Sequence, residues 1–180
     1  MSPPEQISTE RLLLRKPRLT DATAIFEEYA RDPEATRYLL FRPHEDIAKT
    51  NAFLEMRLAK WGGGEELVWA ITVTPDDRLV GMIACRFDGH RADLGYVLAR
   101  RLWGRGYMSE AVRAVAEWAL SQDGIHRVWA VCDTGNAASA RVMEKAGMTR
   151  EGILRRWLVH PNISDQPRDC FVYSKVRGEA

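Results

Sequence analysis

A strand, a glycine-containing loop, a helix and a second strand follow one another in the centre of the chain, and this unit restricts the fold more than any other segment. The strand-like run 93–98 leads into the loop 101–106, a periodic helix covers 107–120, and a strand follows at 127–132. A strand–helix–strand crossover requires a parallel pair of strands and is right-handed. The pattern therefore predicts a sheet of mixed strand direction, with the loop at the carboxyl end of the first strand.

The loop Arg101-Leu102-Trp103-Gly104-Arg105-Gly106 has the composition of an anion-binding site. Its glycines let the backbone approach a ligand without a Cβ atom in the way, and the amides that follow lie at the positive end of a helix. Arginines add charge-assisted donors, so a diphosphate is the expected ligand. The loop lacks the Lys-Ser/Thr end of a P-loop and the three glycines of a dinucleotide fold. The alternative is a plain turn whose arginines, Arg100 included, are only solvated.

At these residues the chain resembles the GNAT superfamily of acyl-CoA-dependent N-acetyltransferases. The family's diphosphate loop has Gln or Arg, two variable residues, Gly, one variable residue, then Gly or Ala, and Arg101, Gly104 and Gly106 match it. Residues 93–98 resemble the family's fourth strand, and residues 127–152 resemble its fifth strand with the next helix and strand. The resemblance covers nearly the whole chain, including Thr9 to Arg15. Similarity to the Rim-type branch, which acetylates ribosomal-protein N-termini, lies in Asn136, Ser139, Gly147, Met148, Glu151 and Gly152.

Composition agrees with one compact domain spanning residues 1–180. The chain is 46% hydrophobic and 28% charged, and its net charge of +1 gives no overall field that would attract nucleic acid. The cysteines Cys85, Cys132 and Cys170 are widely spaced and odd in number, which is typical of reduced thiols in a cytoplasmic protein. We expect no secretion signal, no membrane span and no metal, because the N-terminus lacks a basic and apolar leader and the histidines are scattered.

Hydrophobic periodicity predicts the remaining elements. Strands are expected at 11–16, 67–73, 79–85, 153–159 and 169–176, and helices at 22–29, 45–61 and 137–146. Gly62, Gly63 and Gly64 are expected to end the second of the three. The predicted fold is a mixed α/β, GNAT-like twisted sheet of about six to seven strands with helices on both faces.

The resemblance implies how such a sheet forms its site. In the family, strands four and five splay apart, and the pantetheine arm of acetyl-CoA lies in the gap, bonded to the backbone of strand four. The matching positions here are Tyr96, Val97 and Leu98. The implied cofactor-binding residues continue through the loop and the start of its helix, with Arg101, Leu102, Trp103, Gly104, Arg105, Gly106, Tyr107 and Met108.

Asn136 and Ser139 lie at the start of the helix 137–146, and helix capping alone could explain both residue types. In the family this helix start lies beside the cofactor sulfur, which implies that Asn136 holds the pantetheine and Ser139 protonates the departing thiolate. Many relatives carry a tyrosine acid two turns into the helix, but here the position is Met143, which has no proton to donate. Water is the alternative acid. A covalent route through Cys132 is conceivable but lacks an evident paired base.

The expected activity is direct transfer of an acetyl group from acetyl-CoA to a primary amine. The general base stays open between Asp93, Glu151, His160 and water. The Rim-type resemblance favours a protein N-terminal α-amino group as acceptor, and the segment 157–164 is expected to shape that side. The alternatives are a small-molecule amine and a non-catalytic acyl-CoA-binding sensor. Beyond acetyl-CoA and the acceptor, no direct nucleic-acid or membrane partner is expected, and the chain is a monomer or a homodimer.

Overall fold

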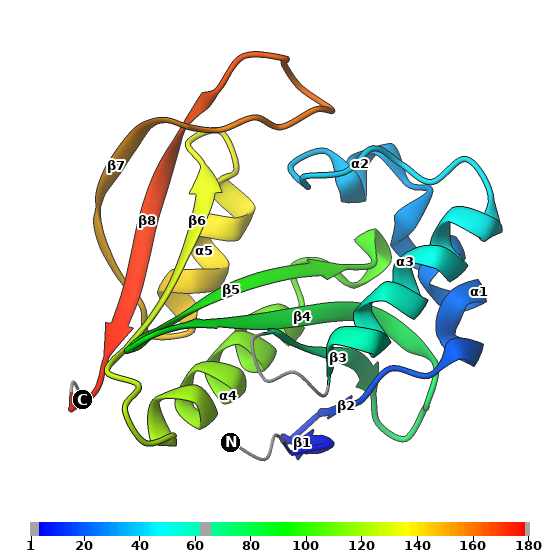
Figure 1. Ribbon diagram of the computed structural model, residues 1–180, viewed down its shortest axis with the longest axis horizontal. Helices are drawn as coiled ribbons and strands as arrows, with labels where there is room; N and C mark the ends of the chain where they lie inside the picture. The colour runs from blue at the N-terminus through cyan, green and yellow to red at the C-terminus, as the bar shows by residue number, and fades with distance from the viewer. Residues whose placement is uncertain (1–3, 62–65, 179–180) are drawn as a thin grey trace.

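The computed structural model describes residues 4–61 and 66–178, which form one eight-stranded sheet in the order β1-β2-β3-β4-β5-β6-β8-β7 (Figure 1). Neighbouring strands are antiparallel except β5 and β6, which are parallel. The strands are β1 (Gln6–Ser8), β2 (Leu12–Arg15), β3 (Glu66–Val73), β4 (Leu79–Asp88), β5 (Arg91–Leu98), β6 (Arg127–Asp133), β7 (Thr149–Leu158) and β8 (Arg168–Val176). The predicted mixed α/β class is therefore confirmed, with eight strands in place of six to seven.

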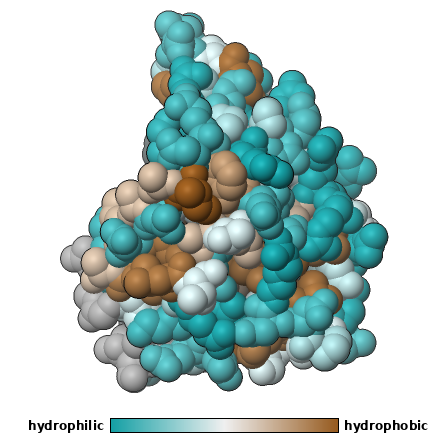
Figure 2. Space-filling model, turned by 90° about the vertical axis from the view of Figure 1, so that its right-hand side faces the viewer, coloured by the Kyte–Doolittle hydropathy of each residue, from teal (hydrophilic) through white to brown (hydrophobic). Residues whose placement is uncertain are grey.

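Helices cover the two faces of this sheet. α4 packs on β2, β4, β5 and β6 and against α5, while α1 packs on α3 and β4, and α3 packs on β3. Figure 2 views the side on which α1 and α3 lie in Figure 1 and shows a largely hydrophilic face with hydrophobic residues gathered in patches. The helical segments are η1 (Leu19–Asp21), α1 (Ala22–Ile25), η2 (Phe26–Ala30), α2 (Pro33–Thr36), α3 (Ile47–Lys60), η4 (Arg100–Leu102), α4 (Tyr107–Ser121) and α5 (Ala137–Lys145).

The core lies where the sheet is covered on both faces. β3 is buried along nearly its whole length, as expected of a central strand with helices on each side. Trp69 of β3 is fully buried, and its ring makes edge contacts with Trp61 and Trp118 at centroid distances of 5.5 and 5.2 Å. Along α4 the predicted apolar stripe is buried, which fixes the helix against the sheet.

β5 and β6 pair over a short stretch and then diverge. Their register runs from Arg91 opposite Arg127 to Asp93 opposite Trp129, and no pairing between them continues beyond that point in the described chain. The carboxyl-terminal half of β5 therefore leaves one backbone edge without a strand partner. Figure 1 shows the two strands separating toward the end at which α2 and α5 lie. The splay that the family resemblance implied is present.

The sequence expectations differ from the structure at several elements. β1 and the short helix α2 were not expected, and β7 begins at Thr149 rather than at residue 153. The expected helix 22–29 is a 3₁₀ turn, one α-helical turn and then the π-helix η2. The expected stop at Gly62, Gly63 and Gly64 lies outside the described residues. No helix in the described ranges is long and apolar enough to cross a membrane.

Candidate active site

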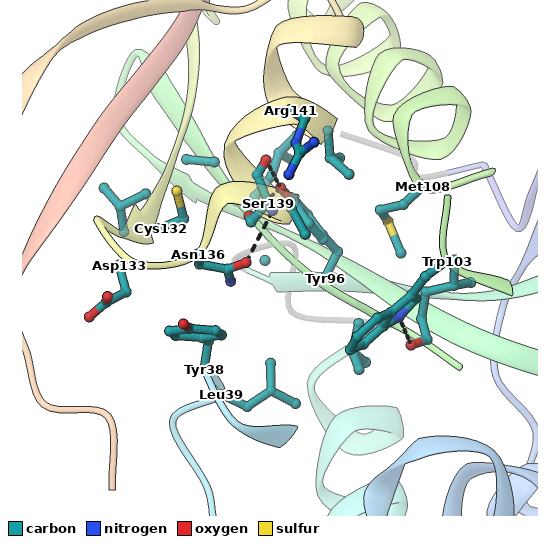
Figure 3. A pocket seen from close by; sticks show the side chains of 18 of the residues that line it. Tyr38, Leu39, Tyr96, Trp103, Met108, Cys132, Asp133, Asn136, Ser139 and Arg141 are labelled. Carbon is teal, nitrogen blue, oxygen red and sulfur yellow. Dashed lines mark hydrogen bonds between the residues drawn. The ribbon is translucent and has the colours of Figure 1, made fainter. Parts of the chain in front are cut away.

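A cavity of about 860 Å³ occupies the gap between β5 and β6. It is bounded by the carboxyl-terminal half of β5, by β6 and the start of α5, by the loop before α4, and by α2 with the chain that follows it. Its size is within the range of ligand sites. Figure 3 shows that side chains from these separate segments converge on one space. We therefore treat the cavity as the candidate active site.

The loop before α4 presents an open helix N-terminus to this cavity. Gly104 and Gly106 have φ angles of 77° and 81°, a region that favours glycine, and Gly106 is the N-cap of α4. Among the described residues no side chain caps this helix, which leaves its first amides available to bind an anion. The indole Nε1 of Trp103 donates to Leu98 O at 2.8 Å and so ties the loop to the end of β5.

The loop arginines are not among the residues that line the cavity. Leu102, Trp103, Gly104, Gly106, Tyr107 and Met108 line the cavity, but Arg101 and Arg105 do not. The Arg101 guanidinium binds Glu28 of η2 through Nε at 2.9 Å and Nη2 at 3.0 Å. Arg100 Nε is 3.0 Å from Asp32 Oδ2. These pairs fasten the loop to η2 and to the start of α2, and the expected contact of Arg101 with an anion stays a prediction.

The segment 9–15 also holds the loop and the start of α4 in place. The sequence alone assigned no role to this segment. Arg11 Nε donates to Glu110 Oε2 at 2.7 Å, Thr9 Oγ1 donates to Glu110 Oε1 at 2.6 Å, and Arg11 Nη1 donates to Arg105 O at 3.1 Å. Burial acts to raise the pKa of Glu110, but these hydrogen bonds outweigh it and leave that pKa below its ordinary value. The carboxylate therefore stays charged and holds the first turn of α4 in place.

Positive charge in the cavity comes from residues that sequence reasoning missed. Arg141 and Lys145 of α5 line it, as do Arg37 and Arg86. Arg141 and Lys145 are four residues apart and therefore share one face of the helix. The sequence signal for these two residues was their position in the helix that begins after Asn136, five and nine residues along the chain.

Tyr96 reaches Ser139 across the cavity. The Tyr96 hydroxyl and Ser139 Oγ are 2.8 Å apart, and Figure 3 shows the two side chains meeting from β5 and α5. Burial raises the pKa of Tyr96, so the phenol keeps its proton. Val97 and Leu98 also line the cavity, as their sequence positions predicted. The side-chain contact of Tyr96 was not predicted, since only its backbone was expected to act.

Asn136 and Ser139 lie together at the start of α5. Asn136 Oδ1 accepts a hydrogen bond from Ser139 N at 3.1 Å, so the predicted N-cap is confirmed. Met143 is fully buried in the core and has no place in the cavity. Cys132 does line the cavity, but burial raises the pKa of its thiol to about 12. A thiol that keeps its proton is a poor nucleophile, which argues against the covalent route.

We expect Asn136→Ala to destabilise the protein by about 1 kcal/mol, because the mutation removes the cap that receives Ser139 N. The variant should also bind CoA more weakly, because residue 136 lines the cavity. Thermal unfolding and calorimetry measure the two effects. Asn136→Ser is the matched control, since serine caps nearly as well as asparagine. If Asn136→Ser restores both stability and CoA affinity, the residue acts only as a cap.

The structure distinguishes between the three side chains that were candidates for the general base. Glu151 does not line the cavity, and hydrogen bonds from Arg127 and Ser174 lower its pKa to about 2. Asp93 does line it but accepts a hydrogen bond from Arg86 Nε at 2.8 Å. His160 lines it as well and is buried. Glu151 is therefore removed from the candidates.

The end of the cavity away from α4 is roofed by contacts between loops. The Tyr38 hydroxyl donates to Gly135 O at 3.1 Å, which joins the chain after α2 to the turn before α5. Asn162 Nδ2 donates to Thr36 O and to Phe41 O, each at 2.8 Å. Leu158 and His160 of the segment 157–164 line the cavity, together with residues after α2 that were not predicted; that this is the acceptor side stays a prediction.

Comparison with known proteins identifies the family. The family model of the acetyltransferase (GNAT) domain matches residues 11–149, and the chain belongs to that family. An uncharacterised N-acetyltransferase, p20 of Bacillus licheniformis, is 31% identical over 97% of this chain and 98% of its own. A GNAT-family acetyltransferase from Bacillus anthracis has a TM-score of 0.83 at 29% identity, covering 97% of this chain and 99% of that one. The protein is therefore an N-acetyltransferase.

A more distant structure shares the fold alone. RimL, a ribosomal L7/L12 alpha-N-protein acetyltransferase in complex with coenzyme A, has a TM-score of 0.84 at 18% identity, covering 96% of this chain and 98% of that one.

Proposed function

We propose that the protein transfers the acetyl group of acetyl-CoA to the α-amino group of a protein or peptide N-terminus. One observation carries the proposal: the cavity that begins at the open N-terminus of α4 passes Tyr96 and Ser139 and continues to Tyr38 and His160. Such a cavity can hold a long acyl donor at one end and an amine at the other. Crystals of RimL with coenzyme A support the choice of donor.

The donor half has groups suited to each part of acetyl-CoA. The free amides at the start of α4 take the diphosphate, and Arg141 and Lys145 supply positive charge nearby. Ala99 N donates to Val80 O of β4 at 2.8 Å. Because amides alternate between the two edges of a strand, those of Leu98 and Tyr96 point into the gap. They are placed to bind the pantetheine arm.

The transfer then needs few further groups. A neutral amine attacks the thioester carbonyl, and an amide of β5 donates to the carbonyl oxygen as it gains charge. The sulfur takes a proton from Ser139 or from water as the carbon–sulfur bond breaks. Cys132 has no part in this route. The chain's contribution is to hold both reactants in one water-poor space, which itself accelerates the reaction.

The roofed end of the cavity supports a chain terminus as acceptor. The hydrogen bond from Tyr38 to Gly135 joins two lining segments and narrows this end of the cavity. An amine in the middle of a folded surface does not fit such an end, whereas the first residues of an extended chain do. RimL, which shares the fold, is named as an alpha-N-protein acetyltransferase.

A thiol-release assay over short peptides and free amines tests this function. We expect amine-dependent release of CoA, with kcat/KM at least about tenfold higher for peptides with a free N-terminus than for small amines, which corresponds to about 1.4 kcal/mol of transition-state binding. The same peptides with a blocked N-terminus are the control. Preference for small amines would contradict the proposed acceptor. Binding of acetyl-CoA with no turnover on any amine would make the protein a sensor.

A further inference from the structure

The carboxylates that line the cavity are all held by arginines. Glu34, Asp93 and Asp133 are the acidic residues of its lining. Their partners in ion pairs are Arg37, Arg86 and Arg168 respectively. For Asp93 and Asp133 these partners also form hydrogen bonds, which occupy carboxylate oxygens that a substrate group would otherwise contact.

His160, which also lines the cavity, is buried and has no hydrogen-bond partner among residues 4–61 and 66–178. It is 3% exposed, and neither ring nitrogen has a hydrogen-bond partner within the described part of the chain. A buried polar group without a partner is costly, and native structures rarely leave one unsatisfied without a ligand, a water or a function to explain it. The residue lines the cavity, so a small shift of the ring or of its neighbours would let a group in the cavity supply that partner.

A buried carboxylate lies close to the His160 ring. Its Nε2 is 3.8 Å from Asp133 Oδ2, and Asp133 is fully buried. Burial acts to raise the pKa of Asp133, but hydrogen bonds from Arg168 and from Gly135 N leave that pKa below its ordinary value. The carboxylate therefore stays charged beside the ring. Arg168 binds the same carboxylate, and Tyr38 packs against the ring.

The Tyr38 ring packs against the His160 ring and orients it. The rings of Tyr38 and His160 meet edge to face, with centroids 6.1 Å apart and planes 84° apart. Tyr38 is itself held by its hydrogen bond to Gly135 O. The imidazole is thus positioned at the roofed end of the cavity, between the buried carboxylate and the place proposed for the acceptor.

We propose that His160 is the proton acceptor for the ammonium group of the acceptor, directly or through one water. The inference rests on the proposed function. One N–H bond of the ammonium breaks, its electron pair stays on nitrogen, and the proton bonds to an imidazole nitrogen. The neutral amine then forms the N–C bond. As the C–S bond breaks, the sulfur takes a proton from Ser139 or water, and the second amine proton replaces it there. His160 finally releases the first proton to solvent.

The pH dependence of His160→Gln tests this assignment. Without the imidazole, only amine that is already neutral can react, so kcat/KM should rise with the pKa of the amine itself, about 8 for an α-amino group. At pH about 6.5 only a few per cent of that amine is neutral, and we expect kcat/KM at least about tenfold below the parent. Above pH about 9 the two proteins should converge, because the amine needs no base there.

A second measurement separates this role from a structural one. In the parent, the pH at which kcat/KM rises should be the same for peptides with different α-amino pKa values. In His160→Gln, that pH should shift with the pKa of the peptide's α-amino group. His126→Gln, which replaces an exposed histidine outside the cavity, is the matched control and should behave as the parent. Calorimetry with CoA confirms that the donor site is intact in each variant.

The outcomes are distinct. If the parent acetylates no amine, the proposed function fails, whatever His160 does. If the parent is active and His160→Gln keeps its pH profile, or loses activity by one factor at every pH, the inference about His160 is wrong. A fall confined to acidic and neutral pH supports it.

Discussion

Gly104→Val should weaken CoA binding by ten- to a hundredfold. Gly104 has a φ of 77°, and valine at such an angle is strained, so the loop must change its backbone to accept it. That change displaces the amides that lead into α4. A hydrogen bond to a charged group contributes about 1.5–3 kcal/mol, so losing one amide contact to the diphosphate gives an effect of this size. Calorimetry on the folded variant measures it.

Gly124→Val is a matched control for the backbone strain that valine causes in Gly104→Val. Gly124 has a φ of 78°, and an added Cβ there meets nothing within 4 Å, as at Gly104. It lies in the turn after α4, at the other end of the helix from the cavity. We expect both variants to lose a similar amount of stability and only Gly104→Val to lose CoA affinity. Equal affinities for the two variants and the parent would show that the diphosphate does not bind at this loop.

The parts of the site that were predicted are those that neighbouring residues determine. The glycines of the loop, the apolar stripe of α4 and the Asn136 cap depend on contacts within one turn of the chain, so the sequence pattern contains them. The strands 93–98 and 127–132 were likewise confirmed with nearly their predicted bounds. Their splay followed from the family resemblance rather than from periodicity.

The parts that could not be predicted depend on residues far apart in the chain. Arg101 has the position of a phosphate ligand in the motif, but Glu28 from η2 binds it. Nothing local to the loop reveals that partner. In the same way, the sequence shows Tyr96 only as a strand residue. Its contact with Ser139 depends on how α5 packs in the folded protein. The three candidate bases looked equivalent because their ion-pair partners lie on other strands.

Ser139→Ala should lower kcat by about ten- to a thousandfold while CoA affinity changes little, and this is the largest catalytic effect that we expect. With Met143 buried, Ser139 is the hydroxyl of α5 that faces the cavity. The range is moderate because a thiol with a pKa of about 8.5 already leaves as a fair leaving group. Single-turnover measurements, in which acetyl transfer limits the rate, give kcat for the chemical step.

Tyr96→Phe tells whether Ser139 acts alone. The Tyr96 hydroxyl lies 2.8 Å from Ser139 Oγ, and because burial raises the pKa of Tyr96, the phenol can replace the proton that serine gives to the sulfur. We expect a smaller loss than in Ser139→Ala and no further loss in the double variant, since both residues serve one proton path. Ser121→Ala, at the far end of α4, is the control and should change nothing. Full kcat in Ser139→Ala would make the serine a helix-start residue and water the acid.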